Sequence, residues 1–174
     1  MNTTTPNKNF WVWGLICAVL WSCATLGVLL AQAQGGFGWW VLLIHPRDPA
    51  TLLGVLTAPL FSATLYEWIN NTCVMFVLIV VGSVHGWRFV RDGAIVWISA
   101  GLSVWAFGNS ELYHMGVSPL CYGVCAWLMV HNLVRRNMVR TAVALLAAAI
   151  TLPLFELTWL AAIPTVVAIV LGRR

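Results

Sequence analysis

One segment of the chain combines residue types that can do covalent chemistry. Gly116-Val117-Ser118 stands at the start of an apolar run, which predicts the Ser118 hydroxyl at the mouth of a membrane helix. A serine hydroxyl is a weak nucleophile until an adjacent base takes its proton. His114 is the nearest candidate base, and Glu67 is a second candidate. Each also has a structural interpretation: Ser118 as a helix N-cap, His114 and Glu67 as hydrogen-bonding groups near helix ends.

The composition predicts a polytopic membrane protein. Hydrophobic residues make up 61% of the 174 residues and charged residues 8%, against roughly 25% charged residues in soluble domains. The mean hydropathy is +0.88. The five cysteines all fall in apolar runs, and we interpret them as packing residues. No His pair has spacing typical of metal ligands, so neither a metal nor a cofactor is expected.

Six apolar segments are predicted to be membrane-spanning helices. Their approximate bounds are 10–31, 65–84, 94–107, 118–133, 141–154 and 158–171. They form one membrane domain over 10–174, after a polar tail over 1–9. The shorter segments require helix tilt or local thinning of the bilayer. The connection over 32–59 includes a short apolar stretch that we expect at the membrane interface.

The charges test this arrangement. Eight of the nine Lys and Arg residues fall in alternate connections, namely Lys8, Arg88, Arg91, Arg135, Arg136, Arg140, Arg173 and Arg174. By the positive-inside rule both termini are then cytoplasmic. Topology explains the net charge of +4, so no nucleic-acid partner is implied. Contact of the basic residues with anionic lipid is a secondary effect.

Several patches between about residues 46 and 135 resemble bacterial members of the rhomboid family of intramembrane serine proteases. They are Pro46-Arg47, Gly54-Val55-Leu56-Thr57 with Pro59, Glu67-Trp68-Ile69-Asn70-Asn71-Thr72, Val104-Trp105-Ala106-Phe107-Gly108, His114-Met115-Gly116-Val117-Ser118 and Tyr122-Gly123. The resemblance implies a six-helix rhomboid-like bundle with a short third helix. It also implies Ser118 as the nucleophile, Gly116 as part of its motif and Asn71 as a donor in the oxyanion hole.

The chain departs from that family at the catalytic base. The family's histidine lies on the sixth helix, and if Trp159 marks the register, Ala162 takes its place. No histidine follows His131 anywhere in the sequence. Two further family histidines correspond to Ser62 and Glu67, and Pro119 replaces the glycine that usually follows the serine. These departures favour a protein that has kept the rhomboid shape and lost the catalytic pair.

Three functions follow as hypotheses. The first is a non-catalytic rhomboid-like protein of a bacterial inner membrane, which binds transmembrane segments of other membrane proteins or serves as a subunit of a larger membrane complex. The second is an active intramembrane serine protease with Ser118 as nucleophile and His114 or Glu67 as base. The third is a small transporter or channel, disfavoured because few polar residues could line a path.

Overall fold

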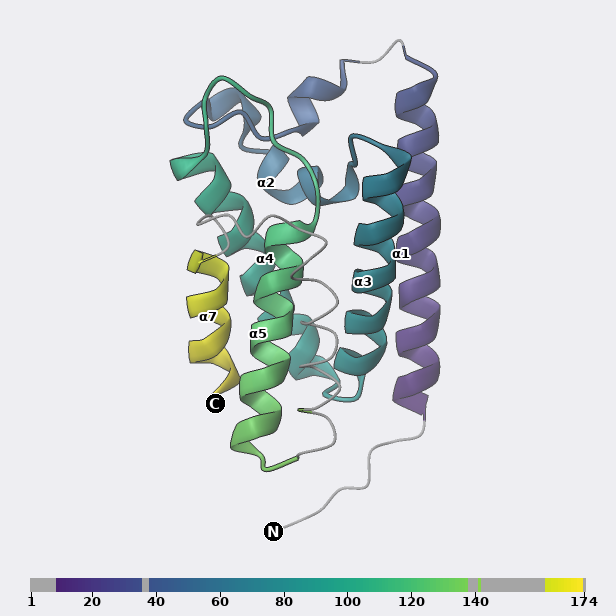
Figure 1. Ribbon diagram of the computed structural model, residues 1–174, viewed down its shortest axis with the longest axis vertical. Helices are drawn as coiled ribbons and strands as arrows, with labels where there is room; N and C mark the ends of the chain where they lie inside the picture. Colours follow the sequence, from purple (N-terminus) through teal and green to yellow (C-terminus); the bar gives the residue numbers. More distant parts are fainter. Residues whose placement is uncertain (1–8, 36–37, 138–140, 142–161, 174) are drawn as a thin grey trace.

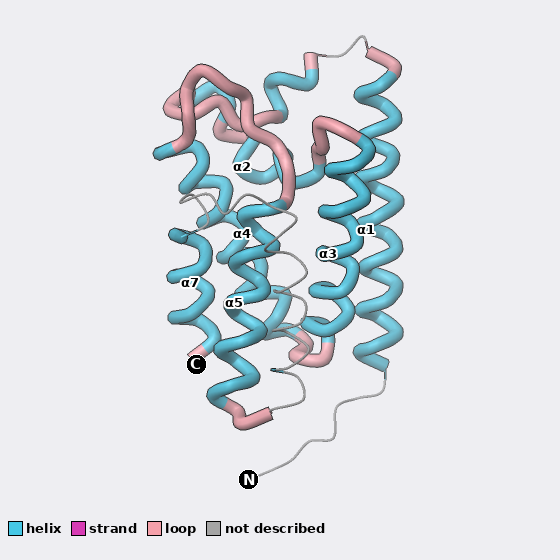
Figure 2. Tube along the Cα trace, viewed as in Figure 1, coloured by secondary structure: helices cyan, strands magenta, loops and turns pink. Residues whose placement is uncertain are grey.

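The computed structural model describes residues 9–35, 38–137, 141 and 162–173. These residues form helices and connecting loops, with no strand among them beyond one isolated bridge between Ile44 and His114 (Figure 2). The predicted all-α class is therefore confirmed. The helix predicted over 141–154 lies outside the described residues except for its first residue, as do the first four residues of the helix predicted over 158–171.

In the described part of the chain, five helices of eleven or more residues lie side by side (Figure 1): α1 (Asn9–Ala33), α3 (Leu65–Ser83), α4 (Trp87–Phe107), α5 (Ser118–Val134) and α7 (Ala162–Gly172). Four short helical segments connect α1 to α3: η1 (Trp39–Leu42), η2 (Pro49–Thr51), α2 (Gly54–Thr57) and η3 (Ala58–Leu60). Helix α1 packs on α3, and α7 packs on α5 and α4.

The two ends of the bundle differ in charge. Helices α1 and α4 begin at the same end of the bundle at which α3, α5 and α7 end (Figure 1). We call it the basic end because arginines at 88, 91, 135 and 173 lie at or next to these helix ends. The opposite end carries the short helices and the loop from α4 to α5, and we call it the cavity end. Among the described residues, these arginines belong to the set that the charge pattern assigns to one side of a membrane.

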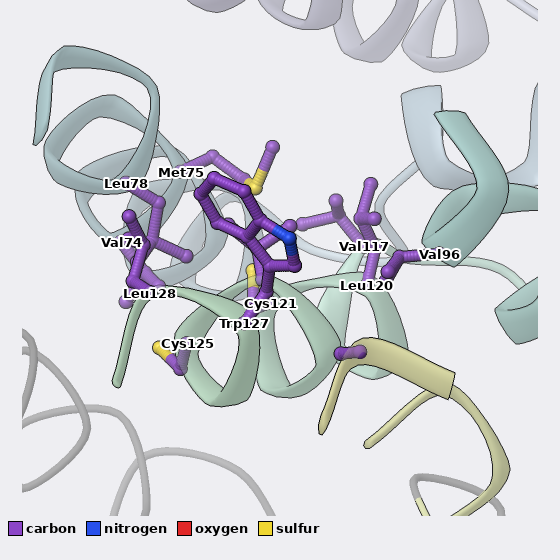
Figure 3. Close-up of a cluster of buried hydrophobic side chains, with 12 residues drawn as sticks. Val74, Met75, Leu78, Val96, Val117, Leu120, Cys121, Cys125, Trp127 and Leu128 are labelled. Atoms are coloured by element: carbon purple, nitrogen blue, oxygen red, sulfur yellow. The ribbon is translucent and has the colours of Figure 1, made fainter. Parts of the chain in front are cut away.

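Helix α5 lies at the centre of the core. Ten of its residues are buried, and six of them belong to a cluster with apolar side chains of α3, α4 and α7 (Figure 3). The largest is Trp127, which is 2% exposed. Cys121 and Cys125 are part of this core, as expected, whereas Cys17, Cys23 and Cys73 are exposed and do not pack inside the chain.

The start of α4 contradicts the sequence prediction. The helix was expected over 94–107 and as a short one, but it begins at Trp87 and has 21 residues. The prediction was wrong because it treated Arg88, Arg91 and Asp92 as loop residues. The charge of Asp92 is accommodated inside the helix since Arg91 donates to its carboxylate.

Two of the described helices, α1 and α3, have the length and apolar composition needed to cross a membrane. Only 17% of the apolar window of α1 and 28% of that of α3 is buried within the chain. Large apolar side chains such as Trp13, Leu20 and Ile69 consequently face outward. An apolar helix with so little of its surface covered differs from the core helix of a soluble protein, which is mostly buried.

Candidate functional site

The loop between α4 and α5 is fixed to the short helices by backbone hydrogen bonds. Ile44 and His114 exchange both backbone bonds, with the His114 N–H 2.7 Å from the Ile44 carbonyl oxygen and the reverse bond at 3.0 Å. The N–H of Gly116 donates to the carbonyl of Ala58 at 3.0 Å. These bonds place the Gly116–Ser118 segment beside η3 and over the start of α3.

Gly116 occupies a position that other residues cannot easily take. Its φ is +103°, in the region that favours glycine. A Cβ atom there would lie 2.8 Å from Oε1 of Glu67 and 3.8 Å from Nδ2 of Asn71. The absence of a side chain therefore lets the loop backbone approach both polar residues on the first turns of α3.

Glu67 belongs to the start of α3. The Thr64 hydroxyl accepts from the Glu67 N–H at 3.1 Å, and the Glu67 carboxylate accepts from the Ala63 N–H at 2.9 Å. This reciprocal arrangement is close to a capping box, which satisfies N–H groups that a helix start leaves unpaired. Asn71 donates to the other carboxylate oxygen at 3.5 Å. Glu67 therefore has a structural task in the described chain.

The cap leads to a stability prediction. Replacing Thr64 with Ala should lower the free energy of unfolding by about 1 kcal/mol, the usual cost of losing a polar N-cap. Thr64→Ser, which keeps the hydroxyl, should cost much less. Unfolding in mild detergent followed by circular dichroism measures both, and equal losses for the two variants would contradict this role of the hydroxyl.

Asn71 is the candidate oxyanion-hole residue, and it is 4% exposed. Its Oδ1 atom is buried and has no hydrogen-bond partner within the described part of the chain. Its amide nitrogen lies on the side of Gly116, and its contact with Glu67 is long for a hydrogen bond. The amide is therefore held only weakly in its present position.

Ser118 lines a cavity at the cavity end. It is the first residue of α5, Val117 holds the N-cap position and no side chain caps the helix, so the N-cap interpretation of Ser118 is wrong. Pro119 lies in the first turn, where its missing N–H costs little. The cavity has a volume of about 190 Å³. The half-buried Ser118 side chain makes no hydrogen bond with any described residue.

His114 lines the same cavity as Ser118. Its Nε2 atom lies 3.0 Å from the carbonyl oxygen of Asn109. Because a carbonyl only accepts, Nε2 carries the proton and Nδ1 carries the lone pair when the ring is neutral. The structure therefore brings Ser118 and His114 to one cavity, but among the described contacts no hydrogen bond joins them.

The other histidines lie away from Ser118 in the described contacts. His45 contacts Tyr113, with ring centroids 4.8 Å apart. His85 and His131 are in contact with each other at the basic end, with centroids 4.6 Å apart. Of the four histidines in the sequence, His114 is the one that lines the cavity together with Ser118.

Helix α7 begins at Ala162, the position compared with the family's histidine. It runs in the same direction as α5, because Pro164 lies against Gly123 while Gly172 lies against the Trp127 carbonyl. Ala162 is two residues before Pro164 and Ser118 is five before Gly123. At 1.5 Å per residue, Ala162 stands about one turn from Ser118 along the helix axis. Trp159, the register mark, lies outside the described residues.

The sequence analysis missed a second polar centre at the basic end. Asp92, 2% exposed, accepts from Arg91 Nε at 2.7 Å and from Trp127 Nε1 at 2.9 Å. The Trp127 ring stacks on His131 with centroids 4.7 Å apart. An ionisable residue inside an apolar helix is a functional candidate, and Asp92 could have been noticed on that ground.

Comparisons with known proteins found bacterial relatives. Uncharacterized proteins of Mycobacterium bovis and Mycobacterium tuberculosis are each 32% identical to the chain over 141 residues, which are 78% of this chain and 59% of the relative. An uncharacterized protein of Mycobacterium leprae is 36% identical over 93 residues, 49% of this chain and 37% of that protein. The chain thus spans less than two thirds of these curated relatives. Neither a family model nor a solved structure matches it.

Proposed function

We propose that the chain is a six-span, rhomboid-like protein of a bacterial inner membrane that binds transmembrane segments of other membrane proteins and does not cleave them. The observation that carries this proposal is that no side chain able to act as a base is hydrogen-bonded to Ser118 among the described residues. His114, the histidine within its cavity, is bonded to the Asn109 carbonyl, and the Glu67 carboxylate caps α3. Without a base, the serine hydroxyl stays a weak nucleophile.

Membrane placement is supported by the exposed apolar faces of α1 and α3 and by the gathering of arginines at the basic end. With the basic end in the cytoplasm, as the positive-inside rule requires, the start of α1 and the end of α7 both lie on the cytoplasmic side. The cavity end then faces the opposite side of the membrane.

Binding of a protein segment is supported by the size and lining of the cavity. Its volume of about 190 Å³ is below the range of roughly 300–1,000 Å³ typical of small-molecule pockets. Its walls are mainly apolar, with the small residues Ala58, Ala100 and Gly101 among them. Small residues allow helices to approach closely within a membrane. The cavity therefore suits one or two side chains of a partner helix.

The test of the missing base is labelling of the detergent-solubilised chain with a fluorescent fluorophosphonate, which reacts with activated serines. We expect no labelling of the unmodified chain, and none of the matched Ser118→Ala variant. Ala162→His should gain labelling if position 162 faces Ser118. Labelling of the unmodified chain that is lost in Ser118→Ala would overturn the non-catalytic assignment.

The test of binding is photo-crosslinking in native membranes. A photoreactive residue at the cavity-lining Met115 should give adducts with a defined membrane protein, whereas one at Leu112, an exposed position of the same loop, should not. Ser118→Ala should leave the adducts unchanged. Purification of the chain alone from mild detergent, with no adducts from Met115, would contradict the proposal.

The second candidate is an active intramembrane serine protease. It is favoured by one observation: Ser118 and His114 line the same cavity, and Nδ1 of His114 has a lone pair. On this candidate, His114 Nδ1 would accept the proton of Ser118 after a rearrangement of the loop or of the His114 ring. This candidate predicts labelling that disappears in both Ser118→Ala and His114→Gln.

A further inference from the structure

A cavity at the basic end lies between α4, α5 and α7, away from Ser118. Its volume is about 390 Å³, within the range of ligand sites. The cavity is lined by four polar residues, Arg88, Arg91, Asp92 and His131, and by the apolar residues Ile95 and Leu171. No part of the proposed function uses this cavity.

The two arginines of this cavity have unused hydrogen-bonding capacity. Nε and Nη2 of Arg91 both contact the same carboxylate oxygen of Asp92. The other N–H groups of Arg91 have no partner among the described residues. The guanidinium of Arg88, one turn earlier, makes no hydrogen bond or ion pair in the described chain. An arginine guanidinium matches phosphate geometry with paired donors.

Buried contacts position these donors. Asp92 is anchored on its other oxygen by Trp127 Nε1, and Trp127 is fixed by stacking on the buried His131. The guanidinium of Arg91 is therefore held at the rim, with about half of its side chain exposed. Arg135, the C-cap residue of α5, follows His131 by four residues and adds positive charge at the same end of the helix.

The walls of the cavity change from polar to apolar. Ile95 lies one turn beyond Arg91 on α4 and is 42% exposed. Leu171 provides the apolar wall on α7. A molecule whose charged headgroup is bound by the arginines would thus place its hydrocarbon part beside the exposed Ile95 and the partly buried Leu171, as a phospholipid at the membrane surface would.

We propose that this cavity binds the phosphate-bearing headgroup of an anionic phospholipid of the cytoplasmic leaflet. Arg88 and Arg91 bind the phosphate, and Ile95 contacts the upper part of an acyl chain. Basic pockets between transmembrane helices at the cytoplasmic surface are suited to such headgroups. The proposal needs the membrane placement argued above and is independent of what Ser118 does.

The experiment is native mass spectrometry of the full chain in mild detergent, titrated with phosphatidylglycerol, phosphatidylcholine or inorganic phosphate. We expect retention of one phosphatidylglycerol, with phosphatidylcholine bound at least tenfold more weakly. Arg88→Gln should weaken phosphatidylglycerol binding about tenfold, because a hydrogen bond between charged groups is lost. Arg88 is the preferred variant since its guanidinium holds no described residue in place, whereas loss of Arg91 would leave Asp92 without its cation.

The matched control is Arg173→Gln, which removes one positive charge from the same end without touching the cavity lining. It should weaken binding less than threefold. Equal losses for Arg88→Gln and Arg173→Gln would overturn the site and leave only general attraction to the basic end. If phosphatidylcholine bound as tightly as phosphatidylglycerol, the proposed selectivity for an anionic headgroup would be wrong. If inorganic phosphate were retained as strongly as phosphatidylglycerol, the proposal that the ligand is a lipid would be wrong.

Discussion

Replacing Asp92 with Leu should lower the free energy of unfolding by about 3 kcal/mol. The variant removes an acceptor that two donors share, and it leaves the indole N–H of Trp127 buried without a partner. A buried donor that loses its acceptor costs about 1–3 kcal/mol, and hydrogen bonds to charged groups lie at the upper end of measured contributions. Arg91 should contribute less to the loss because its half-exposed guanidinium can be solvated.

Two further variants make this prediction specific. Asp92→Asn keeps the shape but has one acceptor oxygen instead of two, so either Arg91 or Trp127 loses its bond, at a cost of about 1.5 kcal/mol. In Asp92→Leu/Trp127→Phe both members of the buried pair become apolar, which should recover much of the loss relative to Asp92→Leu. Unfolding in mild detergent, followed by circular dichroism, measures all three. Simple additivity of the two single changes would show that the Asp92–Trp127 bond is not the cause.

Replacing Gly123 with Val should destabilise the contact of α5 with α4 and α7 by about 3 kcal/mol. A Cβ atom on Gly123 would collide with Cγ1 of Val96 and lie 3.3 Å from Cβ of Pro164. Overpacking of a tight core forces side chains out of their rotamers or moves backbone, typically at 1–3 kcal/mol. Two additional methyl groups beyond the Cβ atom place Val at the upper end of that range.

A double-mutant cycle across the helix contact tests this prediction. Gly123→Ala and Val96→Ala should each destabilise the chain, but the double variant should lose at least 1 kcal/mol less than the sum, because one change makes space for the other. Gly93→Ala is the control, because no atom of the described residues lies within 4 Å of its Cβ position on α4. It should be neutral or stabilising by up to about 1 kcal/mol, since alanine favours helix. Additive losses in the double variant would mean that Gly123 and Val96 are not in contact.

The contact at Gly123 also bears on the candidate site. It sets the position of α7 against α5 and with it the distance along the axis between Ala162 and Ser118. If Gly123→Val separates the two helices, a gain of fluorophosphonate labelling by Ala162→His should be lost in the combined variant. That comparison separates a serine activated from α7 from one activated by His114 in the loop.

The sequence by itself determined the features that depend on residues close together in the chain. The apolar runs and their polar limits predicted the helix class and placed the starts of α3 and α5 at Leu65 and Ser118. The placement of arginines predicted which helix ends lie together. The sequence has no histidine after His131, and under the rhomboid resemblance this predicts that the family's catalytic base is missing.

The tertiary structure alone decided which polar groups meet. Asp92 and Trp127 are 35 residues apart, and their bond depends on how α4 and α5 pack. For the same reason the sequence prediction began α4 too late and left out its charged first turns, because the Asp92 carboxylate looked unpaired until its donors were in place. Gly116 against Glu67 and His114 beside Ser118 likewise result from a loop fixed by backbone bonds to Ile44 and Ala58. Hydropathy and spacing describe the surface each segment presents, whereas pairing across helices depends on the contacts of all of them together.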